Sequence, residues 1–135
     1  MARSHQNKQI DKETKLILFD DDRAFSLIIK AFAKSMGVKV DCYESLADLG
    51  SVGRLANYDG AIIDHDLGIF DGVELAQYFE SFCKGKIPVL LISGKGKSAP
   101  NTSWPDVIKG FLHKDSGPGT ILTKISKIVS KKQSL

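Results

Sequence analysis

Short apolar runs and longer amphipathic segments alternate along this chain. Apolar residues follow one another closely in the runs, as is typical of strands, and recur every three or four positions in the segments, as is typical of helices. The runs lie at residues 16–19, 38–42, 61–63, 89–92 and 111–112. The amphipathic segments lie at residues 25–36, 75–83 and 121–129, with a weaker one at 45–57. This alternation predicts an α/β fold, (βα)5, in which helices cover both faces of a parallel sheet.

The runs differ in how continuous they are. Four of them are almost unbroken, as expected of strands that are covered on both faces. Residues 38–42 alternate between apolar and polar side chains instead, which is typical of a strand at the edge of a sheet. The segment at 45–57 is a weak helix, because Gly50 and Gly53 each cost about 1 kcal/mol of helix propensity relative to alanine.

The stretch between the last two runs lacks a helical pattern. Residues 93–110 contain two prolines, several glycines and a cluster of serine, asparagine and threonine. This composition leaves room for about one helical turn, with Pro105 at its first position. We therefore expect a shortened or irregular fourth helix, with Trp104 packed over the gap.

Length, composition and charge fit one folded domain with polar ends. The 135 residues suffice for a single core, and the 42% hydrophobic and 26% charged fractions are ordinary for a globular protein. We expect a flexible polar leader at 1–14, a stand-alone domain at 15–130 and a short basic tail at 131–135. The net charge of +3 is too small to indicate nucleic-acid binding.

The N-terminal residues and the cysteines favour a cytoplasmic location. Residues 1–15 lack the apolar centre of a signal peptide, and no stretch is long enough to insert into a membrane. Cys42 and Cys83 have neither the spacing of a metal site nor that of a disulfide scaffold. We expect both to be reduced, buried or half-buried thiols.

Polar residues follow the predicted strands at the points where the apolar runs end. Asp20 and Asp21 follow the first run, Asp64 the third, Ser93 the fourth, and Lys114 lies just after the fifth. The carboxyl ends of parallel strands share one edge of the sheet, where ligands bind in open α/β folds. We therefore expect these side chains to converge there.

The converging residues have the chemistry of a phosphoryl-transfer site. Carboxylates that crowd together repel one another unless a cation lies among them, and hard oxygen ligands with open positions suit Mg²⁺. A serine hydroxyl and a lysine ammonium can hold phosphoryl oxygens beside that cation. A carboxylate is also a competent nucleophile toward phosphorus, which makes Asp64 a candidate phosphoacceptor.

The motifs around these residues resemble those of the response regulator receiver domains of two-component signalling. The matching pieces are LILFDDD at 16–22, IIDHDLGIFDG at 62–72, PVLLISG at 88–94 and GFLHKD at 110–115. The resemblance extends from about residue 15 to residue 129, and the four pieces occur in the order and spacing of that family. It implies the flavodoxin-like fold, with five parallel strands in the order 2-1-3-4-5.

The resemblance also implies a role for each site residue. Asp64 would be the phosphoacceptor, and Asp21 would bind Mg²⁺ directly while Asp20 often binds it through water. The backbone carbonyl of Asp66 would complete the metal ligands. Ser93 would be the switch hydroxyl, and Lys114 would pair with the phosphoryl group.

Further residues fall at positions that tune or transmit the signal in that family. Phe111 lies where a switching tyrosine is common. Asp66 and Lys95 lie at positions that influence how long the phosphate survives, and we expect them to ion-pair across the pocket. Asp22 is instead expected to cap the first helix. His65 and His113 are interpreted as a loop residue and an outward-facing strand residue, with no partner implied by their spacing.

The sequence thus favours a signalling phosphoacceptor rather than an enzyme. The resemblance implies a histidine kinase or a histidine phosphotransfer protein as phosphoryl donor, Mg²⁺ as cofactor, an unidentified downstream protein and possible homodimerisation. One alternative is a phosphatase of the haloacid dehalogenase type, because Asp64-His65-Asp66 resembles its DxD motif. Another is a degenerate receiver that acts as an unphosphorylated interaction module.

Overall fold

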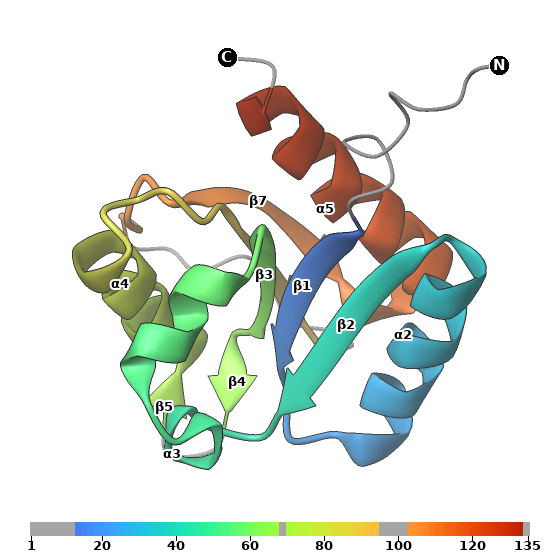
Figure 1. The fold of residues 1–135 in the computed structure, drawn as a ribbon. Helices are drawn as coiled ribbons and strands as arrows, with labels where there is room; N and C mark the ends of the chain where they lie inside the picture. Colours follow the sequence, from blue (N-terminus) through green and yellow to red (C-terminus); the bar gives the residue numbers. More distant parts are fainter. Residues whose placement is uncertain (1–12, 68–69, 95–102, 134–135) are drawn as a thin grey trace, which may run out of the picture.

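A five-stranded parallel sheet forms the centre of the protein (Figure 1). The structure is a computed structural model that describes residues 13–67, 70–94 and 103–133. The strands, in chain order, are β1 (Thr14–Phe19), β2 (Val38–Tyr43), β3 (Gly60–Asp64), β6 (Val89–Ser93) and β7 (Ile108–His113). Their order across the sheet is β2-β1-β3-β6-β7, and every pair is parallel. The predicted flavodoxin-like fold and its strand order 2-1-3-4-5 are therefore confirmed.

Helices cover both faces of this sheet. The helices α2 (Arg23–Ser35) and α5 (Pro118–Gln133) lie side by side on one face. The other face is covered by α3 (Leu46–Leu49), the 3-10 segment η1 (Val52–Asn57) and α4 (Gly72–Phe82). The glycine-interrupted segment thus forms two short helical pieces, begun by the side chains of Ser45 and Ser51, instead of one helix.

Each face of the sheet has its own hydrophobic core. Side chains alternate between the two faces along a strand, so Ile17 and Phe19 join one core while Leu16 and Leu18 join the other. The central strands β1, β3 and β6 are buried on both faces, as their continuous apolar runs predicted. Strand β7 is the second edge strand and most of it is only half-buried, so the expectation of a fully covered strand at 111–112 was wrong.

The apolar stripe predicted for α2 is only partly buried. Ile29 lies in the core and Phe25 packs against it, whereas Ile28, Phe32 and Met36 keep between 41% and 47% of their surface exposed. The sheet face beneath α2 is shared with α5, and Ile121, Leu122 and Ile125 of α5 occupy part of the same core. Three of the five predicted stripe residues therefore lie outside the core.

The connection between β6 and β7 contains no helix in the parts that the structure describes, residues 94 and 103–107. The expected helical turn at Pro105 was wrong, because Ile108 N donates to the Pro105 carbonyl at 3.0 Å and closes a turn that leads directly into β7. The Glu80 carboxylate of α4 holds this connection by accepting a hydrogen bond from Val107 N at 2.9 Å. Trp104 packs against the core, as predicted.

The two ends of the chain differ from the predicted boundaries in detail. Strand β1 begins at Thr14, and α5 continues to Gln133, so the predicted start of the tail at residue 131 falls inside a helix. The leader lies almost wholly outside the described residues. None of the helices described here combines the length and the apolar content needed to cross a bilayer.

Candidate functional site

Three aspartates meet where β1 and β3 end. One carboxylate oxygen from each of Asp20, Asp21 and Asp64 lies within 4.8 Å of the others. The side chains of Asp20 and Asp64 are almost completely buried, with 0% and 5% of their surface exposed, whereas Asp21 is exposed. The parallel pairing of β1 with β3 brings these residues together across more than forty positions of sequence.

Backbone amides orient the two buried carboxylates. Asp22 N donates to Asp20 Oδ1 at 2.9 Å, and Asp66 N donates to Asp64 Oδ1 at 3.1 Å. Asp22 itself caps α2 as predicted, because its carboxylate accepts a hydrogen bond from Phe25 N at 3.1 Å. In each pair one carboxylate oxygen is used by the backbone, which leaves the other oxygen to face the site.

The Asp71-Gly72 pair begins α4 directly behind the candidate acceptor. Asp71 caps the helix by accepting a hydrogen bond from Val73 N at 2.8 Å, and Glu74 completes a capping box. A Cβ atom at Gly72 would lie 2.8 Å from His65 Cα and in collision with the backbone of Asp64. Only glycine therefore allows α4 to pack this closely against the end of β3.

Lys114 lies between the two buried carboxylates. Its Nζ is 2.7 Å from Asp20 Oδ2 and 3.0 Å from Asp64 Oδ2, and it lies 4.8 Å from the centre of the Phe25 ring. Burial alone would lower the pKa of Lys114, but its contacts with the two carboxylates outweigh that effect and raise the pKa. The lysine is therefore charged, and it neutralises part of the negative charge of the site.

Asp20 is the most strongly perturbed acid of the site. Burial, with a smaller contribution from the charge of Asp64, raises the pKa of its carboxyl, while Lys114 and the Asp22 amide oppose the rise. The net pKa is about 6 instead of 3.8. Apart from the ammonium group of Lys114, Asp20 Oδ2 has no hydrogen-bond partner among the described residues. One lysine thus falls short of compensating the two buried acids.

The donor set fits a hard divalent cation. All three candidate ligands are carboxylates, two of them buried and one open to solvent, which suits an ion such as Mg²⁺ that keeps several of its waters. The under-compensated negative charge at Asp20 and Asp64 is what such an ion would neutralise. Asp20, Asp21 and Asp64 would hold the metal, as predicted from the sequence. The predicted contribution of the Asp66 carbonyl stays a prediction.

Ser93 ends β6 beside the aspartates. In the sheet register Asp64 pairs with Ile92, so Ser93 extends just past the end of β3. The residue is fully buried, and its Oγ has no hydrogen-bond partner among the described residues. A buried hydroxyl without a partner costs free energy, and a phosphoryl oxygen at Asp64 would be a suitable partner.

Phe111, which pairs with Leu91 of β6, stacks on Trp104. Their ring centroids are 6.4 Å apart with an interplanar angle of 26°. Phe111 also meets the ring of His113 edge to face at 5.3 Å. Both Phe111 and Trp104 are partly buried against the core, so the predicted switch position is covered by an aromatic side chain from the β6–β7 connection.

Two residues predicted to tune the lifetime of the phosphate remain, Asp66 and Lys95. Asp66 is exposed in a two-residue strand, β4 (Asp66–Leu67), which pairs antiparallel with β5 (Phe70–Asp71), a hairpin that the sequence did not reveal. Lys95 lies outside the described residues, so its predicted ion pair with Asp66 is untested.

Two contacts of histidines were missed from the sequence. His65 Nε2 lies 3.4 Å from Asp71 Oδ1, and His113 packs against Phe111. The spacing of His65 and Asp71 around the acceptor could have suggested the first contact. Neither Cys42 nor Cys83 forms a disulfide, and both are half-buried, as expected.

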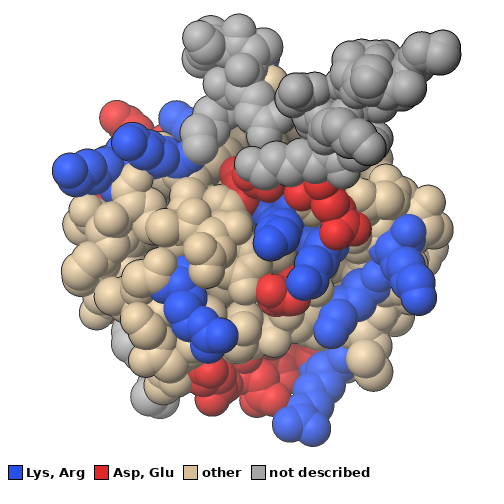
Figure 2. Space-filling model, viewed as in Figure 1, with Lys and Arg blue, Asp and Glu red and all other residues tan. Residues whose placement is uncertain are grey.

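Figure 2 shows where charged side chains lie on one face of the molecule. In Figure 2, acidic side chains gather along the lower edge, where the loops that leave β1 and β2 lie in Figure 1. Lysine and arginine side chains lie over the right-hand side, where β2 and α2 lie. Other acidic side chains lie among the basic ones in the centre and upper part of this face.

Solved structures with the same architecture are receiver domains. A CheY-like response regulator receiver domain from Methanospirillum hungatei JF-1 superposes with a TM-score of 0.73, 16% sequence identity and coverage of 91% of this chain and 98% of that one. A putative response regulator from Chloroflexus aurantiacus J-10-fl gives a TM-score of 0.74 at 18% identity, covering 88% of this chain and 99% of that one. At these identities the likeness concerns the fold.

Sequence similarity points to the same class. The chain is 30% identical over 97 residues to the response regulator protein TmoT of Ectopseudomonas mendocina, a match that covers 71% of this chain and 42% of that protein. The chain therefore spans less than half the length of this relative, and no protein-family model matches it. Together with the fold, this match confirms the resemblance predicted from the motifs: the chain is a receiver domain of the response-regulator type.

Proposed function

We propose that this domain accepts a phosphoryl group on Asp64 in a Mg²⁺-dependent reaction and thereby switches a protein-interaction surface. The observation that carries the proposal is the arrangement of three aspartates within 4.8 Å, with Lys114 bridging the two that are buried. Such an arrangement is electrostatically costly in isolation, and it has an evident use if a divalent cation and a phosphoryl group occupy it.

The donor would be a phosphohistidine, on a histidine kinase or a histidine phosphotransfer protein. A carboxylate oxygen of Asp64 would form the new O–P bond while the P–N bond to the donor imidazole breaks, and the imidazole takes a proton from solvent. Mg²⁺, when bound, would stabilise the negative charge on the phosphoryl oxygens during the transfer. Lys114 and Ser93 are placed beside the acceptor, where they can hold those oxygens once transferred.

The signal would pass from Ser93 toward Phe111 and Trp104. A hydrogen bond from the Ser93 hydroxyl to the phosphoryl group would satisfy an oxygen that has no partner within residues 13–67, 70–94 and 103–133, and would favour one arrangement of β6 over another. Phe111 lies on the neighbouring strand β7, in contact with Trp104. The proposal includes a cytoplasmic location, where a histidine kinase would present its phosphoryl group, and a lifetime of the phosphate tuned by Asp66 and Lys95.

Intact-mass measurement after incubation with acetyl phosphate and Mg²⁺ tests the proposal. We expect one phosphoryl group per chain, lost when EDTA replaces Mg²⁺ and absent from the Asp64→Asn variant. Asp48→Asn is the matched control, because Asp48 is an exposed acid of α3 outside the site. A phosphatase of the haloacid dehalogenase type would instead turn over a phosphomonoester continuously, and a degenerate receiver would take no label. Either result would overturn the proposal.

A further inference from the structure

The helices on one face of the sheet carry positive charge without any acidic residue. Helix α2 contributes Lys30 and Lys34, besides Arg23, which is ion-paired with Glu44 at 2.9 Å, and α5 contributes Lys124, Lys127 and Lys131. Neither helix contains aspartate or glutamate, although the whole chain has 16 such residues. The net charge of the whole chain is only +3, but the surface formed by α2 and α5 is positively charged, and such a surface attracts acidic partners.

The same surface exposes large apolar side chains. Leu27, Ile28, Phe32 and Met36 of the α2 region retain 68%, 47%, 46% and 41% of their surface. The remaining exposed large apolar side chain of the described residues, Phe82, lies on α4 on the opposite face. A group of exposed apolar residues on one helix is typical of an interaction surface.

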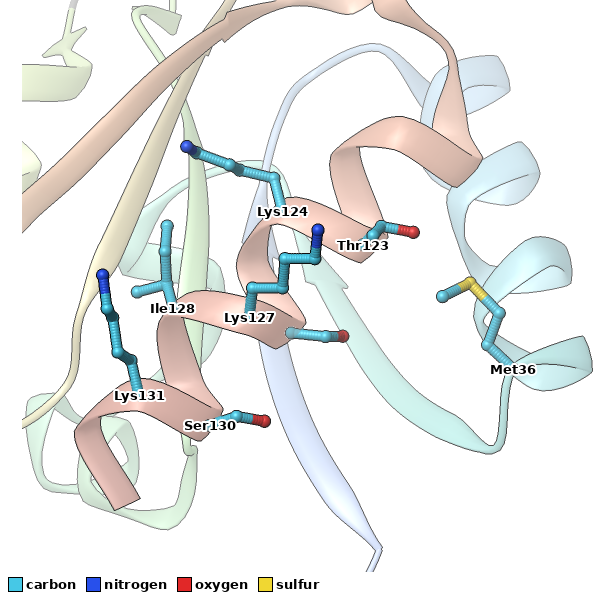
Figure 3. Close-up of a pocket in the computed structure, with 8 residues that line it drawn as sticks. Met36, Thr123, Lys124, Lys127, Ile128, Ser130 and Lys131 are labelled. Atoms are coloured by element: carbon cyan, nitrogen blue, oxygen red, sulfur yellow. The ribbon is translucent and has the colours of Figure 1, made fainter. Parts of the chain in front are cut away.

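A groove lies where the C-terminal end of α2 meets α5. It has a volume of about 730 Å³ and is lined by Met36 from the end of α2 and by seven residues of α5. Figure 3 shows the hydroxyl side chains of Thr123 and Ser130 on the side of α5 that faces Met36. Lys124, Lys127 and Lys131 also line the groove. The groove thus combines an apolar side, a floor of small side chains and a cationic rim.

This groove is remote from the aspartate cluster. Helix α2 begins beside Asp22 at the carboxyl edge of the sheet and runs 13 residues to Ser35, about 20 Å at the rise of an α-helix. Met36 therefore lies near the opposite edge, as the positions of α2 and α5 in Figure 1 show. A partner in the groove would not contact the phosphoryl-transfer site.

We propose that this groove, between Met36 and the lysine-bearing half of α5, binds an acidic amphipathic helix of a partner protein. The apolar face of such a helix would contact Met36 and the small side chains of α5 that face it, Thr123 and Ser130. Its acidic residues would reach the lysines that rise from α5, Lys127 and Lys124. The chemistry follows from charge complementarity, because an amphipathic helix in a groove buries its apolar stripe and leaves its flanks beside the rim. This interaction does not depend on phosphorylation of Asp64.

Other occupants fit the surface less well. A nucleic acid would use the lysines but would leave Met36, the exposed apolar residue that lines the groove, without a role. An anionic lipid surface is broad and flat, whereas the lysines here border a hollow that is lined by Met36 and by α5. A second copy of the chain would bring another positively charged surface against this one.

Fluorescence anisotropy with a designed peptide tests the proposal. The probe is a fluorescein-labelled helix of about 18 residues, five turns, with leucine on one face and glutamate, glutamine and alanine on the others. We expect saturable binding that weakens as salt screens the charges. A scrambled peptide of the same composition, which has the charge but no apolar face, should bind at least about tenfold more weakly.

Variants locate the binding site. Replacing both Lys124 and Lys127 with glutamate should weaken binding of the probe about tenfold, and Met36→Ser about threefold. Lys86→Glu is the matched control, since it makes the same kind of charge change at an exposed position before β6 and should leave binding unchanged. Circular dichroism of each variant confirms that it is folded, and phosphorylation from acetyl phosphate should stay at the parent rate.

Three results would overturn the proposal. The first is equal binding of the amphipathic and scrambled peptides, which would show attraction by charge alone. The second is equal loss of binding in the Lys86→Glu control, which would place the contact elsewhere. The third is absence of binding of the amphipathic peptide. Binding of phosphatidylserine vesicles or duplex DNA, or dimerisation in sedimentation, would then identify a different occupant of this surface.

Discussion

The aspartate cluster lies where β1 and β3 end, whereas the turn that closes the β6–β7 connection lies at the opposite edge of the sheet, beside the start of β6, and the two regions are built in different ways. The cluster consists of buried charges that backbone amides and Lys114 hold in place. The described part of the connection consists of a turn at Pro105 and an aromatic stack, with no helix. The comparison separates two kinds of construction: the cluster holds buried charges that suit the proposed phosphoryl transfer, and the described part of the connection is held by apolar stacking and one hydrogen bond to Glu80.

Removing the charge of Lys114 should have the largest effect on the cluster. We expect Lys114→Met to lower the free energy of unfolding of the metal-free protein by about 3 kcal/mol, because it leaves two buried carboxylates without their cation. Urea titration with EDTA measures this loss, and added Mg²⁺ should recover part of it. Lys109→Met, on the exposed side of β7, is the control. Equal losses in both variants would show that the bridging position is unimportant.

Neutralising Asp20 should have a smaller effect of the opposite sign. The pKa of Asp20 is raised from 3.8 to about 6 on folding, so its ionisation opposes folding, and this cost appears as the pH rises through 6. We expect Asp20→Asn to raise the free energy of unfolding by about 1 to 2 kcal/mol at pH 7.5 in EDTA, and to change it little near pH 4.

The same variant should lose stabilisation by Mg²⁺. Thermal unfolding with and without the ion compares Asp20→Asn with Asp106→Asn, a change to an exposed acid in the turn before β7. If Asp20→Asn raised the free energy of unfolding equally at pH 7.5 and at pH 4, the cost could not come from the ionised carboxylate of Asp20.

Breaking the aromatic stack should affect the connection and spare the cluster. We expect Trp104→Leu to cost about 1 kcal/mol of stability, since it removes the stack on Phe111 but keeps an apolar side chain. The rate of phosphorylation from acetyl phosphate should change less than about twofold, because Trp104 stacks on Phe111 and packs against the core, away from the charges that the mechanism uses. A loss of phosphorylation as large as that of Lys114→Met would mean that the two regions act as one unit.

Deleting the Ser93 hydroxyl should have the smallest effect on stability. Its Oγ is buried and has no hydrogen-bond partner in the described part of the chain, so Ser93→Ala should be neutral or stabilise the unphosphorylated protein by about 0.5 kcal/mol. The same variant should hold the phosphoryl group less well, measured as faster loss of label after excess acetyl phosphate is removed. Marked destabilisation without phosphate would show that the hydroxyl has a partner before phosphorylation.

The sequence predicted the cluster well because its geometry follows from topology. Once β1 and β3 are adjacent parallel strands, residues that end them must meet, and Asp20, Asp21 and Asp64 do. The bridging role of Lys114 between Asp20 and Asp64 needed coordinates, because a long flexible side chain can reach several partners. The close approach of Gly72 to the acceptor was likewise visible only in the packing of α4.

The connection and the surface of α2 were harder to predict. Proline and glycine showed that a regular helix was unfavourable at 93–110, but they did not show where the turn would close or that Glu80 would hold it. The apolar period of α2 correctly predicted a helix and wrongly predicted burial of the whole stripe. Periodicity reports which residues share a face, and the area available beneath that face depends on neighbours such as α5.

Borohydride mapping of the phosphorylated residue tests the central claim most directly. Borohydride reduces an aspartyl phosphate to homoserine, so peptide mass mapping after acetyl phosphate treatment identifies the carboxylate that carried the phosphoryl group. We predict homoserine at position 64 alone, formed with Mg²⁺ and absent with EDTA. Conversion of a different carboxylate, or conversion at Asp64 that is indifferent to Mg²⁺, would contradict the claim that the cluster binds a divalent cation in order to phosphorylate Asp64.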